Sequence, residues 1–467
     1  MIIKYSVVVI YFLILIGLGF LASRRIKSLS DFYVGGKKLG FWVVAFSTRA
    51  TGESAWLLLG LTGLGALVGY SAYWVVLGEV LGVFVAWFFM AKPFKELTDR
   101  FESITIPDYL HSRFNATSNT LRIIAATSLS VFVIIYVSAQ IDATGSAFES
   151  FLGWNYYTGA IAGFAIVVIY IFYGGFVAVA WSDVFQGSLM FLGLVILPIY
   201  IFFHIGSVDI VHQKLKMMDP GLVNIWGPGG PNAINIAAIL GYAMIGLGFM
   251  GSPQVFVRFM SIKNKQEINK GRWVALIFTL FTDAAAVTIG ILGRYLFTET
   301  GQDVEIIFGN GAQNVLPQMV DTLLPMLLAA VYIAVVLAAI MSTIDSLLVV
   351  ASSAIVRDFD QQVLKNHRKD HARYSRKVTL VMAIAALAIA LTISVLSPTR
   401  TIFWFVIFGW SGIAATFCPM MILSLFWKGY NERGAIASMI TGFLCVPLFK
   451  FGATSLPGLG IYFTQVA

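Results

Sequence analysis

Apolar stretches long enough to cross a membrane recur along nearly the whole chain, and only short polar segments separate them. About 20 apolar residues in a helix span the hydrocarbon core of a bilayer. Counted this way, the pattern predicts an all-α, polytopic membrane protein with about 12 transmembrane helices. The predicted helices cover roughly residues 4–23, 40–64, 72–91, 121–147, 156–178, 185–204, 234–256, 273–297, 323–352, 378–397, 402–426 and 434–451.

Composition supports a single membrane domain over residues 1–467. Hydrophobic residues make up 58% of the chain and charged residues 12%, whereas about a quarter of an ordinary soluble domain is charged. A water-soluble fold cannot bury that much apolar surface, and no stretch is left for a soluble enzyme domain. The formal net charge of +8 does not indicate a nucleic-acid partner, because the basic residues follow membrane topology.

Basic residues concentrate in alternate loops, which predicts the orientation of the chain. The positive-inside rule assigns these loops to the cytoplasm and places the N-terminus outside, in a bacterial-type inner (plasma) membrane. The basic residues are Arg24, Arg25, Lys27, Lys37 and Lys38, then Lys92, Lys95, Arg100 and Arg113, then Lys263, Lys265, Lys270 and Arg272, and finally Arg357, Lys365, Arg368, Lys369, Arg373, Arg376 and Lys377.

Two of the predicted spans contain helix-breaking sequence. The second carries a polar run from Thr48 to Ser54, and the seventh carries Gly246, Gly248, Gly251 and Pro253. Transporters built from inverted repeats bind ions and solutes where two corresponding helices are interrupted. Because the breaks lie five spans apart, we expect repeats over 40–204 and 234–426, with extra helices at 4–23 and 434–451. The alternative explanation for the glycines is that they only allow close packing between helices.

Arg49, Glu53 and Asp142 are ionisable residues inside predicted spans, where each costs about 2.5 to 3.5 kcal/mol near the bilayer centre. Arg49 and Glu53 are four residues apart, so they can neutralise each other on one helical face. Asp142 either joins a charge network with Arg49 and Glu53 or contacts a cationic part of a solute.

The ninth span presents hydroxyl groups in an apolar background. Helical periodicity places Ala339, Ser342, Thr343 and Ser346 on one stripe, beside Asp345. Hydroxyls and freed backbone carbonyls can replace the hydration shell of Na⁺ with neutral oxygens. The alternative is that these hydroxyls only bond back to carbonyls of their own helix.

Five ordered motifs resemble the sodium:solute symporter family, and in particular its sodium/proline symporters. They are SDFYVGGKKLG at 30–40, ITIPDYLHSRF at 104–114, GGFVAVAWSDVFQ at 174–186, GFMGSPQVFVRFM at 248–260 and AAIMSTIDS at 338–346. The resemblance implies a LeuT-like core of two inverted five-helix repeats.

The resemblance also implies site residues by position. Na⁺ would contact the carbonyls of Ala50, Glu53 and Ala339 and the hydroxyls of Ser342 and Thr343. Asp183, grouped here with Ser346 and Asp345, would assist sodium release or hold a second ion. The solute side would comprise Ser54, Ala55, Tyr136, Gln140, Ile245 and Phe249. Proline carriers have Trp and Tyr in place of Ile245 and Phe249, and an acid in place of Gly52.

The expected function is sodium-coupled import of a small organic solute, most simply proline or a similar small amino acid, by alternating access of a monomer. A proton-coupled carrier is the first alternative, with Glu53, Asp142, Asp183 and Asp345 as candidate protonation sites. A solute-sensing membrane module is the second. An enzyme is not expected, because the sequence lacks an HExxH motif, a phosphate-binding loop and a nucleophile elbow.

Overall fold

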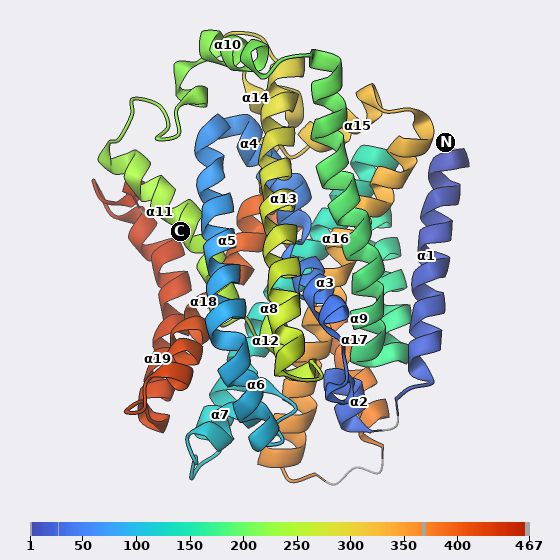
Figure 1. The fold of residues 1–467 in the computed structure, drawn as a ribbon, viewed down its shortest axis with the longest axis vertical. Coiled ribbons are helices and arrows are strands. Elements are labelled where there is room, and N and C mark those ends of the chain that lie inside the picture. Colours follow the sequence, from blue (N-terminus) through green and yellow to red (C-terminus); the bar gives the residue numbers. More distant parts are fainter. Residues whose placement is uncertain (1, 27, 367–369, 463–467) are drawn as a thin grey trace.

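The computed structural model describes residues 2–26, 28–366 and 370–462, which form a helical bundle (Figure 1). Among them the β-structure is limited to one isolated bridge between Leu39 and Ile262. Lys27, Arg368 and Lys369, which the sequence assigns to basic loops, lie outside the described residues.

The first half of the chain supplies ten helices within the described residues. They are α1 (Ile2–Ser23), α2 (Leu29–Val34), α3 (Phe41–Gly52), α4 (Thr62–Val68), α5 (Tyr73–Val85), α6 (Ala91–Arg100), α7 (Ile106–Arg113), α8 (Thr120–Leu152), α9 (Tyr156–Ile205) and α10 (Val208–Met218).

The second half supplies nine more over the same described part of the chain. They are α11 (Ala233–Leu247), α12 (Pro253–Ser261), α13 (Lys265–Phe297), α14 (Val304–Phe308), α15 (Val315–Leu323), α16 (Met326–Ser353), α17 (His371–Leu396), α18 (Ile402–Phe426) and α19 (Glu432–Pro447).

All 12 apolar windows correspond to helical segments, although only ten helices of the described residues are long and apolar enough to cross a membrane on their own. The second window is interrupted after α3, and its remainder continues through α4 toward α5. The fifth and sixth windows join into α9, which bends at Gly175, where φ is 50° and ψ is −155°. The all-α membrane fold predicted from the sequence is confirmed.

Local signals set several helix starts on the face that carries the basic loops. Ser28 forms a capping box with Asp31 at the start of α2. Thr105 caps α7, where Pro107 occupies the first turn, and Asn264 caps α13. These caps satisfy backbone N–H groups that the first turn of a helix leaves without partners.

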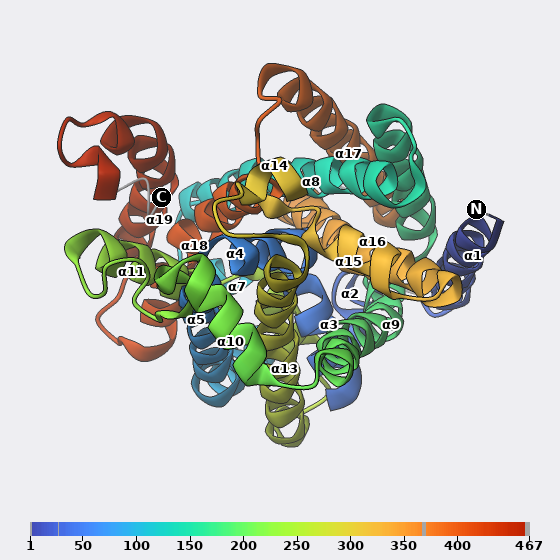
Figure 2. The ribbon, with the colours of Figure 1, turned by 90° about the horizontal axis from the view of Figure 1, so that it is seen from above.

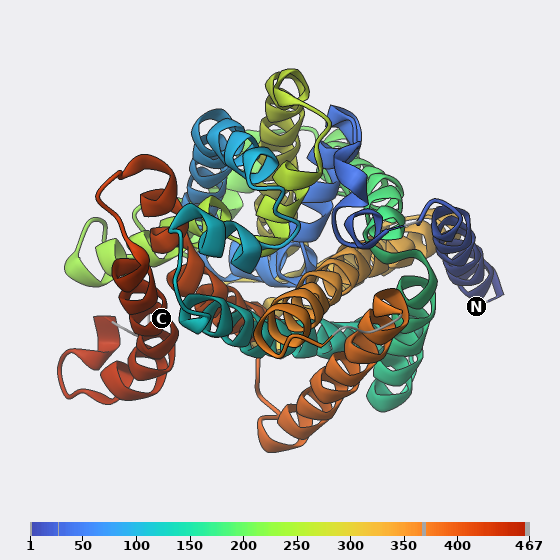
Figure 3. The same ribbon diagram turned by 90° about the horizontal axis from the view of Figure 1, so that it is seen from below.

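The central helices are enclosed and the flanking helices are not. In the helical run that begins with α16, 83% of the most apolar window is buried, against 28% in α1. α16 packs against α8, α9 and α3, and α1 lies on the outer side of α9 and α16. Seen from either end, α1 and α19 lie at opposite edges of the bundle (Figures 2 and 3).

The two ends of the bundle differ in charge. Helices α2, α6 and α7, the turn before α13 and the helical residues 354–363 that follow α16 gather at the lower end of Figure 1, whereas α10, α14, α15 and the start of α1 lie at the upper end. The loops with dense basic residues therefore share one end, as alternate loops of a polytopic protein must.

Glycines allow α5 and α11 to approach each other backbone to backbone. A Cβ atom at Gly82 would overlap the carbonyl oxygen of Gly246, and one at Gly246 would overlap that of Gly78. Small residues commonly permit such contact between membrane helices. This seam holds α5 against the end of the helix that precedes the second break.

Substituting Gly82 with Ala is expected to lower the thermal unfolding temperature of the purified protein in detergent. The added methyl group forces two backbones apart, and overpacking of this kind costs about 1 to 3 kcal/mol. Gly17→Ala is the matched control, because a Cβ there meets no atom within 4 Å. An equal unfolding temperature for the two variants would show that the seam is not tightly packed.

Candidate functional site

The first helix break leaves three carbonyl groups of α3 without partners in their own helix. α3 ends at Gly52 because Glu53 leaves the helical region, with φ −95° and ψ 87°. Side chains from elsewhere donate to these carbonyls. Ser342 Oγ donates to Ala50 O at 2.8 Å, Thr343 Oγ1 to Thr51 O at 3.1 Å, and Trp56 Nε1 to Gly52 O at 3.1 Å.

The predicted sodium-binding hydroxyls therefore lie directly against the break. Ser342 and Thr343 also donate to the carbonyl of Ala339, at 3.1 and 3.2 Å. Hydroxyls and carbonyls from α3 and α16 thus converge as neutral oxygens with no net charge, which is the donor set that a hard monovalent cation accepts. Thr51 was not among the predicted ligands, although its carbonyl is the one that accepts from Thr343. The side chain of Glu53 points away from this site and accepts hydrogen bonds from Arg49.

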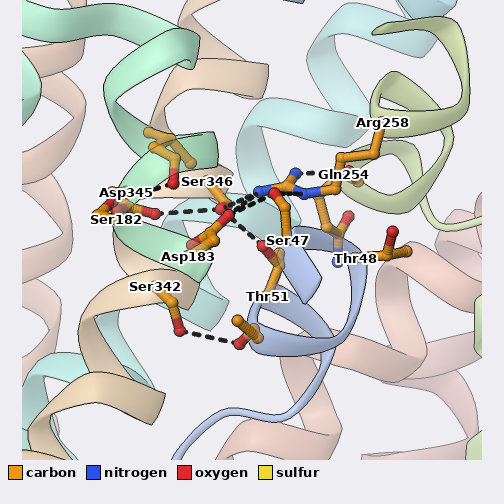
Figure 4. A network of polar contacts seen from close by, with 12 residues as sticks. Ser47, Thr48, Thr51, Ser182, Asp183, Gln254, Arg258, Ser342, Asp345 and Ser346 are labelled. Carbon is orange, nitrogen blue, oxygen red and sulfur yellow. Dashed lines mark hydrogen bonds and ion pairs between the residues drawn. The ribbon is translucent and has the colours of Figure 1, made fainter. Parts of the chain in front are cut away.

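A second polar network lies on the adjacent face of α3, around Asp183 of α9 (Figure 4). Ser47 Oγ donates to Asp183 Oδ2 at 2.5 Å, and Arg258 Nη2 of α12 donates to the same oxygen at 2.8 Å. Arg258 also donates to Ser346 Oγ at 2.5 Å. The guanidinium occupies a position where a cation would contact both Asp183 and Ser346.

Hydroxyls connect this network to the first one. Thr51 Oγ1 and Ser346 Oγ are 2.8 Å apart, and Ser346 Oγ lies 3.1 Å from Asp345 Oδ1. Asp345 in turn accepts a hydrogen bond from Tyr170 at 2.8 Å. The structure therefore brings Asp183, Ser346 and Asp345 together, about one helical turn along α16 from Ser342 and Thr343.

The solute-side residues also meet. Gln140 Oε1 accepts from the backbone N–H of Ala55 at 3.1 Å, and Gln140 Nε2 donates to Ser54 Oγ at 3.1 Å. Tyr136 OH lies 3.3 Å from Ser54 Oγ. The N–H group exposed just after the break is thus satisfied by a side chain of α8.

The second break follows the same principle with donors from α18. Trp410 Nε1 donates to Ile245 O at 2.9 Å, and Cys418 Sγ donates to Gly248 O at 3.1 Å. The Trp410 ring lies 4.9 Å from the Phe249 ring and 6.3 Å from the Tyr136 ring, measured between centroids. Trp410 therefore links the residues predicted on the two sides of the solute pocket.

Arg49 and Glu53 form the ion pair that their spacing predicts. Arg49 Nη2 lies 2.7 Å from Glu53 Oε1, and its guanidinium lies over the Phe249 ring at 4.6 Å. Two further acids share this buried environment: Glu79 of α5, 3.9 Å from Arg49, and Asp283 of α13.

Asp142 belongs to a different region from Arg49. It accepts hydrogen bonds from Arg400 and from Tyr156 OH, beside a cavity of about 350 Å³. The cavity lies beside the C-terminal part of α8, where Ser146 and Glu149 line it, and Asn310 and Gln313 line it as well. The predicted network joining Asp142 to Arg49 and Glu53 is therefore wrong in this structure, because Arg400, in the segment before α18, neutralises Asp142 instead.

Sequence reasoning missed Thr51, Glu79, Arg258, Asp283 and Trp410. Two of them carried a usable signal: Glu79 and Asp283 are single acids inside predicted membrane spans, which is expensive and therefore informative. Arg258 lies just beyond the end of the predicted span 234–256, and the sequence offers it no acidic partner at helical spacing.

Comparison with known proteins agrees with this geometry. The sequence profile described as the Sodium:solute symporter family matches residues 32–442. The chain belongs to the sodium:solute symporter family. Membership makes it a membrane transporter rather than an enzyme, and Na⁺ is the coupling ion of the family.

Curated relatives cover nearly the full chain of this symporter. It is 33% identical over 428 residues to the high-affinity proline transporter PutP of Bacillus subtilis (strain 168), which covers 91% of this chain and 87% of the relative. It is 32% identical over 461 residues to the sodium/proline symporter of Escherichia coli (strain K12), which covers 97% and 88%. Both relatives are bacterial.

A solved structure shares the fold of this symporter. The substrate-bound, outward-open structure of a Na⁺-coupled sialic acid symporter superposes with a TM-score of 0.80 at 19% identity, covering 99% of this chain and 95% of that one. At that identity the likeness concerns the fold, which confirms the LeuT-like architecture.

Substituting Arg258 with Gln is expected to destabilise the symporter by about 3 to 5 kcal/mol, because it leaves the fully buried Asp183 carboxylate without its partner. The double variant Arg258→Gln/Asp183→Asn should regain most of that loss. Thermal unfolding in detergent measures both, with Lys265→Gln as the control, since its pair with Glu96 is exposed. A double variant no more stable than the single one would contradict a buried ion pair between these residues.

Proposed function

We propose that this symporter imports a small amino acid, proline or a close analogue, together with Na⁺. The observation that carries the proposal is the set of neutral oxygens at the first break, where Ala50, Thr51, Ala339, Ser342 and Thr343 meet. In this site the hydroxyl oxygens face the ion, and their hydrogens turn toward other carbonyls. The bound ion then holds α3 against α16.

Solute and ion are coupled through the same break. Ala50 and Thr51 precede Glu53, whereas Ser54 and Ala55, which contact Gln140 and Tyr136, follow it directly. An ion that orders the end of α3 also orders the start of the next segment, so each ligand tightens the binding of the other. The bundle then opens alternately to either side around this site.

A second-ion or release role is proposed for Asp183, with Ser346 and Asp345. A cation that leaves the first site toward Ser346 meets a hydroxyl that already links Thr51 to Asp345. Arg258 contacts both Asp183 and Ser346 in the arrangement described here, so Arg258 must move aside before a cation can use both.

The proposal includes the topology expected from the sequence. The end with dense basic loops faces the cytoplasm and the N-terminus lies outside, in the plasma membrane. Residues 40–204 and 234–426 act as the two repeats, each beginning with an interrupted helix, and the protomer works as a monomer. The matching pair of breaks, after α3 and after α11, supports this division.

The membrane potential and the sodium gradient together provide enough free energy to accumulate a scarce solute. One positive charge moving inward gains about 2.3 kcal/mol per 100 mV, and a tenfold sodium gradient adds about 1.4 kcal/mol. One Na⁺ per solute then supports accumulation of roughly several hundredfold.

The choice of proline rests on the relatives named as proline transporters. Ile245 and Phe249 replace the Trp and Tyr of proline carriers, and Trp410 brings an indole between the two breaks. A pocket lined this way suits a compact apolar side chain with a zwitterionic backbone.

Replacing Ser342 or Thr343 with Ala should raise the sodium concentration for half-maximal uptake about tenfold, because each substitution removes one oxygen that contacts a charged ligand. Ser352→Ala is the matched control: it is buried in the same helix and donates only to Val349 O. Initial uptake rates in proteoliposomes across a sodium series provide the measurement. Sodium dependence equal to that of wild type in both variants would remove these hydroxyls from the ion site.

Transport itself is tested in the same proteoliposomes with radiolabelled L-proline. An inward sodium gradient, with the interior negative, is expected to drive accumulation, and a potassium gradient is not. Uptake driven by a pH gradient without sodium would favour the proton-coupled alternative. Sodium-dependent binding without any net flux would favour a sensor. A screen of other small amino acids identifies the solute if proline is not taken up.

A further inference from the structure

The buried cluster behind Phe249 contains more acids than bases. Arg49 of α3, Glu53 at the break, Glu79 of α5 and Asp283 of α13 all have side chains enclosed by protein, each with less than 2% relative exposure. The guanidinium of Arg49 attracts all three carboxyl groups. With every carboxyl group ionised, two negative charges would remain without a basic partner inside the membrane.

Arg49 already forms an ion pair with Glu53. Its Nε and Nη2 both donate to Glu53 Oε1, at 3.1 and 2.7 Å, whereas Glu79 Oε2 lies 3.9 Å from Nη2 and forms no hydrogen bond. Both carboxyl oxygens of Glu79 lack a hydrogen-bond partner, and so does Asp283 Oδ2. Glu79 and Asp283 are therefore the surplus acids of the cluster.

Isolated charges of this kind do not persist in a membrane-embedded interior, so the surplus must be neutralised by an occupant. A metal ion is disfavoured, because no group of three or more Asp, Glu, His or Cys side chains in the described part of the chain is arranged to hold one. A proton needs only one carboxyl oxygen and no further ligand.

We propose that Glu79 and Asp283 form a proton-binding site, in which each carboxyl group holds one proton while the transporter is closed. The proton leaves water and binds a carboxyl oxygen, which leaves the Arg49–Glu53 pair as the only charged partners of the cluster. Neither acid forms a hydrogen bond or an ion pair with a residue of the proposed sodium site within the described structure.

Groups from several elements around the two acids face the site. α3 and the break contribute Arg49 and Glu53, and α8 contributes Tyr136, whose hydroxyl interacts electrostatically with Glu79. Thr282 Oγ1 donates to the neighbouring Asp283 Oδ1 at 3.3 Å and also interacts with Glu53, which leaves Asp283 Oδ2 without a partner. On the far side of α3, Asp183 and Arg258 neutralise each other at 2.8 Å and add no net charge.

The site is linked to solute binding by position. Phe249, one of the predicted solute-side residues, lies between the cluster and Trp410: its ring covers Arg49 on one face and packs against Trp410. When the pocket opens, water gains access behind Phe249, and the surplus acids can then lose their protons. Closing around solute therefore takes up protons, so the apparent affinity falls as pH rises, by up to about tenfold per pH unit for each linked proton.

Infrared spectroscopy of the purified protein tests the site without reference to transport. The wild type at neutral pH is expected to show a carboxylic-acid C=O band that weakens in Glu79→Gln and in Asp283→Asn and weakens further in the double variant. These amides resemble the protonated acids in shape and charge, so the variants should fold. Glu299→Gln, at an exposed loop acid, is the control and should leave the band unchanged. An identical band in wild type and double variant would overturn the proposal.

The linkage to solute rests on the proposed function and is measured separately, as the pH dependence of L-proline affinity at saturating sodium. We expect affinity to fall with rising pH in the wild type and to be independent of pH in the double variant. An equal pH dependence in both would overturn the linkage. If L-proline does not bind at all, the proposed solute fails, whereas the infrared result still decides whether the two acids hold protons.

Discussion

The structure depends on one constraint: a helix that stops in the middle of a membrane exposes carbonyl groups, and water is not there to satisfy them. The end of α3 meets this constraint by recruiting donors from two other places, the hydroxyls of α16 and the indole of Trp56. Because hydroxyl groups can turn from donating to coordinating, the same contacts can pass from a hydrogen-bonded state to an ion-bound state without loss of partners. An aliphatic seam could not do this.

Helix α3 also separates two charged networks of different character. On one face, Asp183 and Arg258 balance each other through short contacts that include Ser47. On the other face, Arg49 balances Glu53 and leaves further acids near it. The broken helix is thus held on both sides by polar contacts with specific geometry, and any movement of α3 must exchange these contacts. Its packing is less permissive than that of the outer helices α1 and α19, which are far less enclosed by protein.

Periodicity and composition were sufficient to predict the helices, because a bilayer admits few alternatives for an apolar chain of this length. The break after α3 was also predictable, since Thr48 to Ser54 place polar groups at mid-membrane depth. Partners across helices were harder to predict. Arg49 has Glu53 at helical spacing and was paired correctly, whereas Asp142 has no such neighbour, and its partner Arg400 lies 258 residues away. Only the packing of α8 against the segment before α18 decides that contact.

The glycine seam between α5 and α11 has a consequence for how the two breaks can move. Where Gly78 and Gly82 meet Gly246, backbone rests on backbone, and no side chain is available to change rotamer and let one helix slip past the other. The first break, by contrast, faces side chains that can reorient. We therefore expect the second break to move together with α5 as one rigid unit, and relative movement to be concentrated where α3 contacts α16. A cation bound between α3 and α16 would therefore restrict this movement, and it would do so only while it is bound.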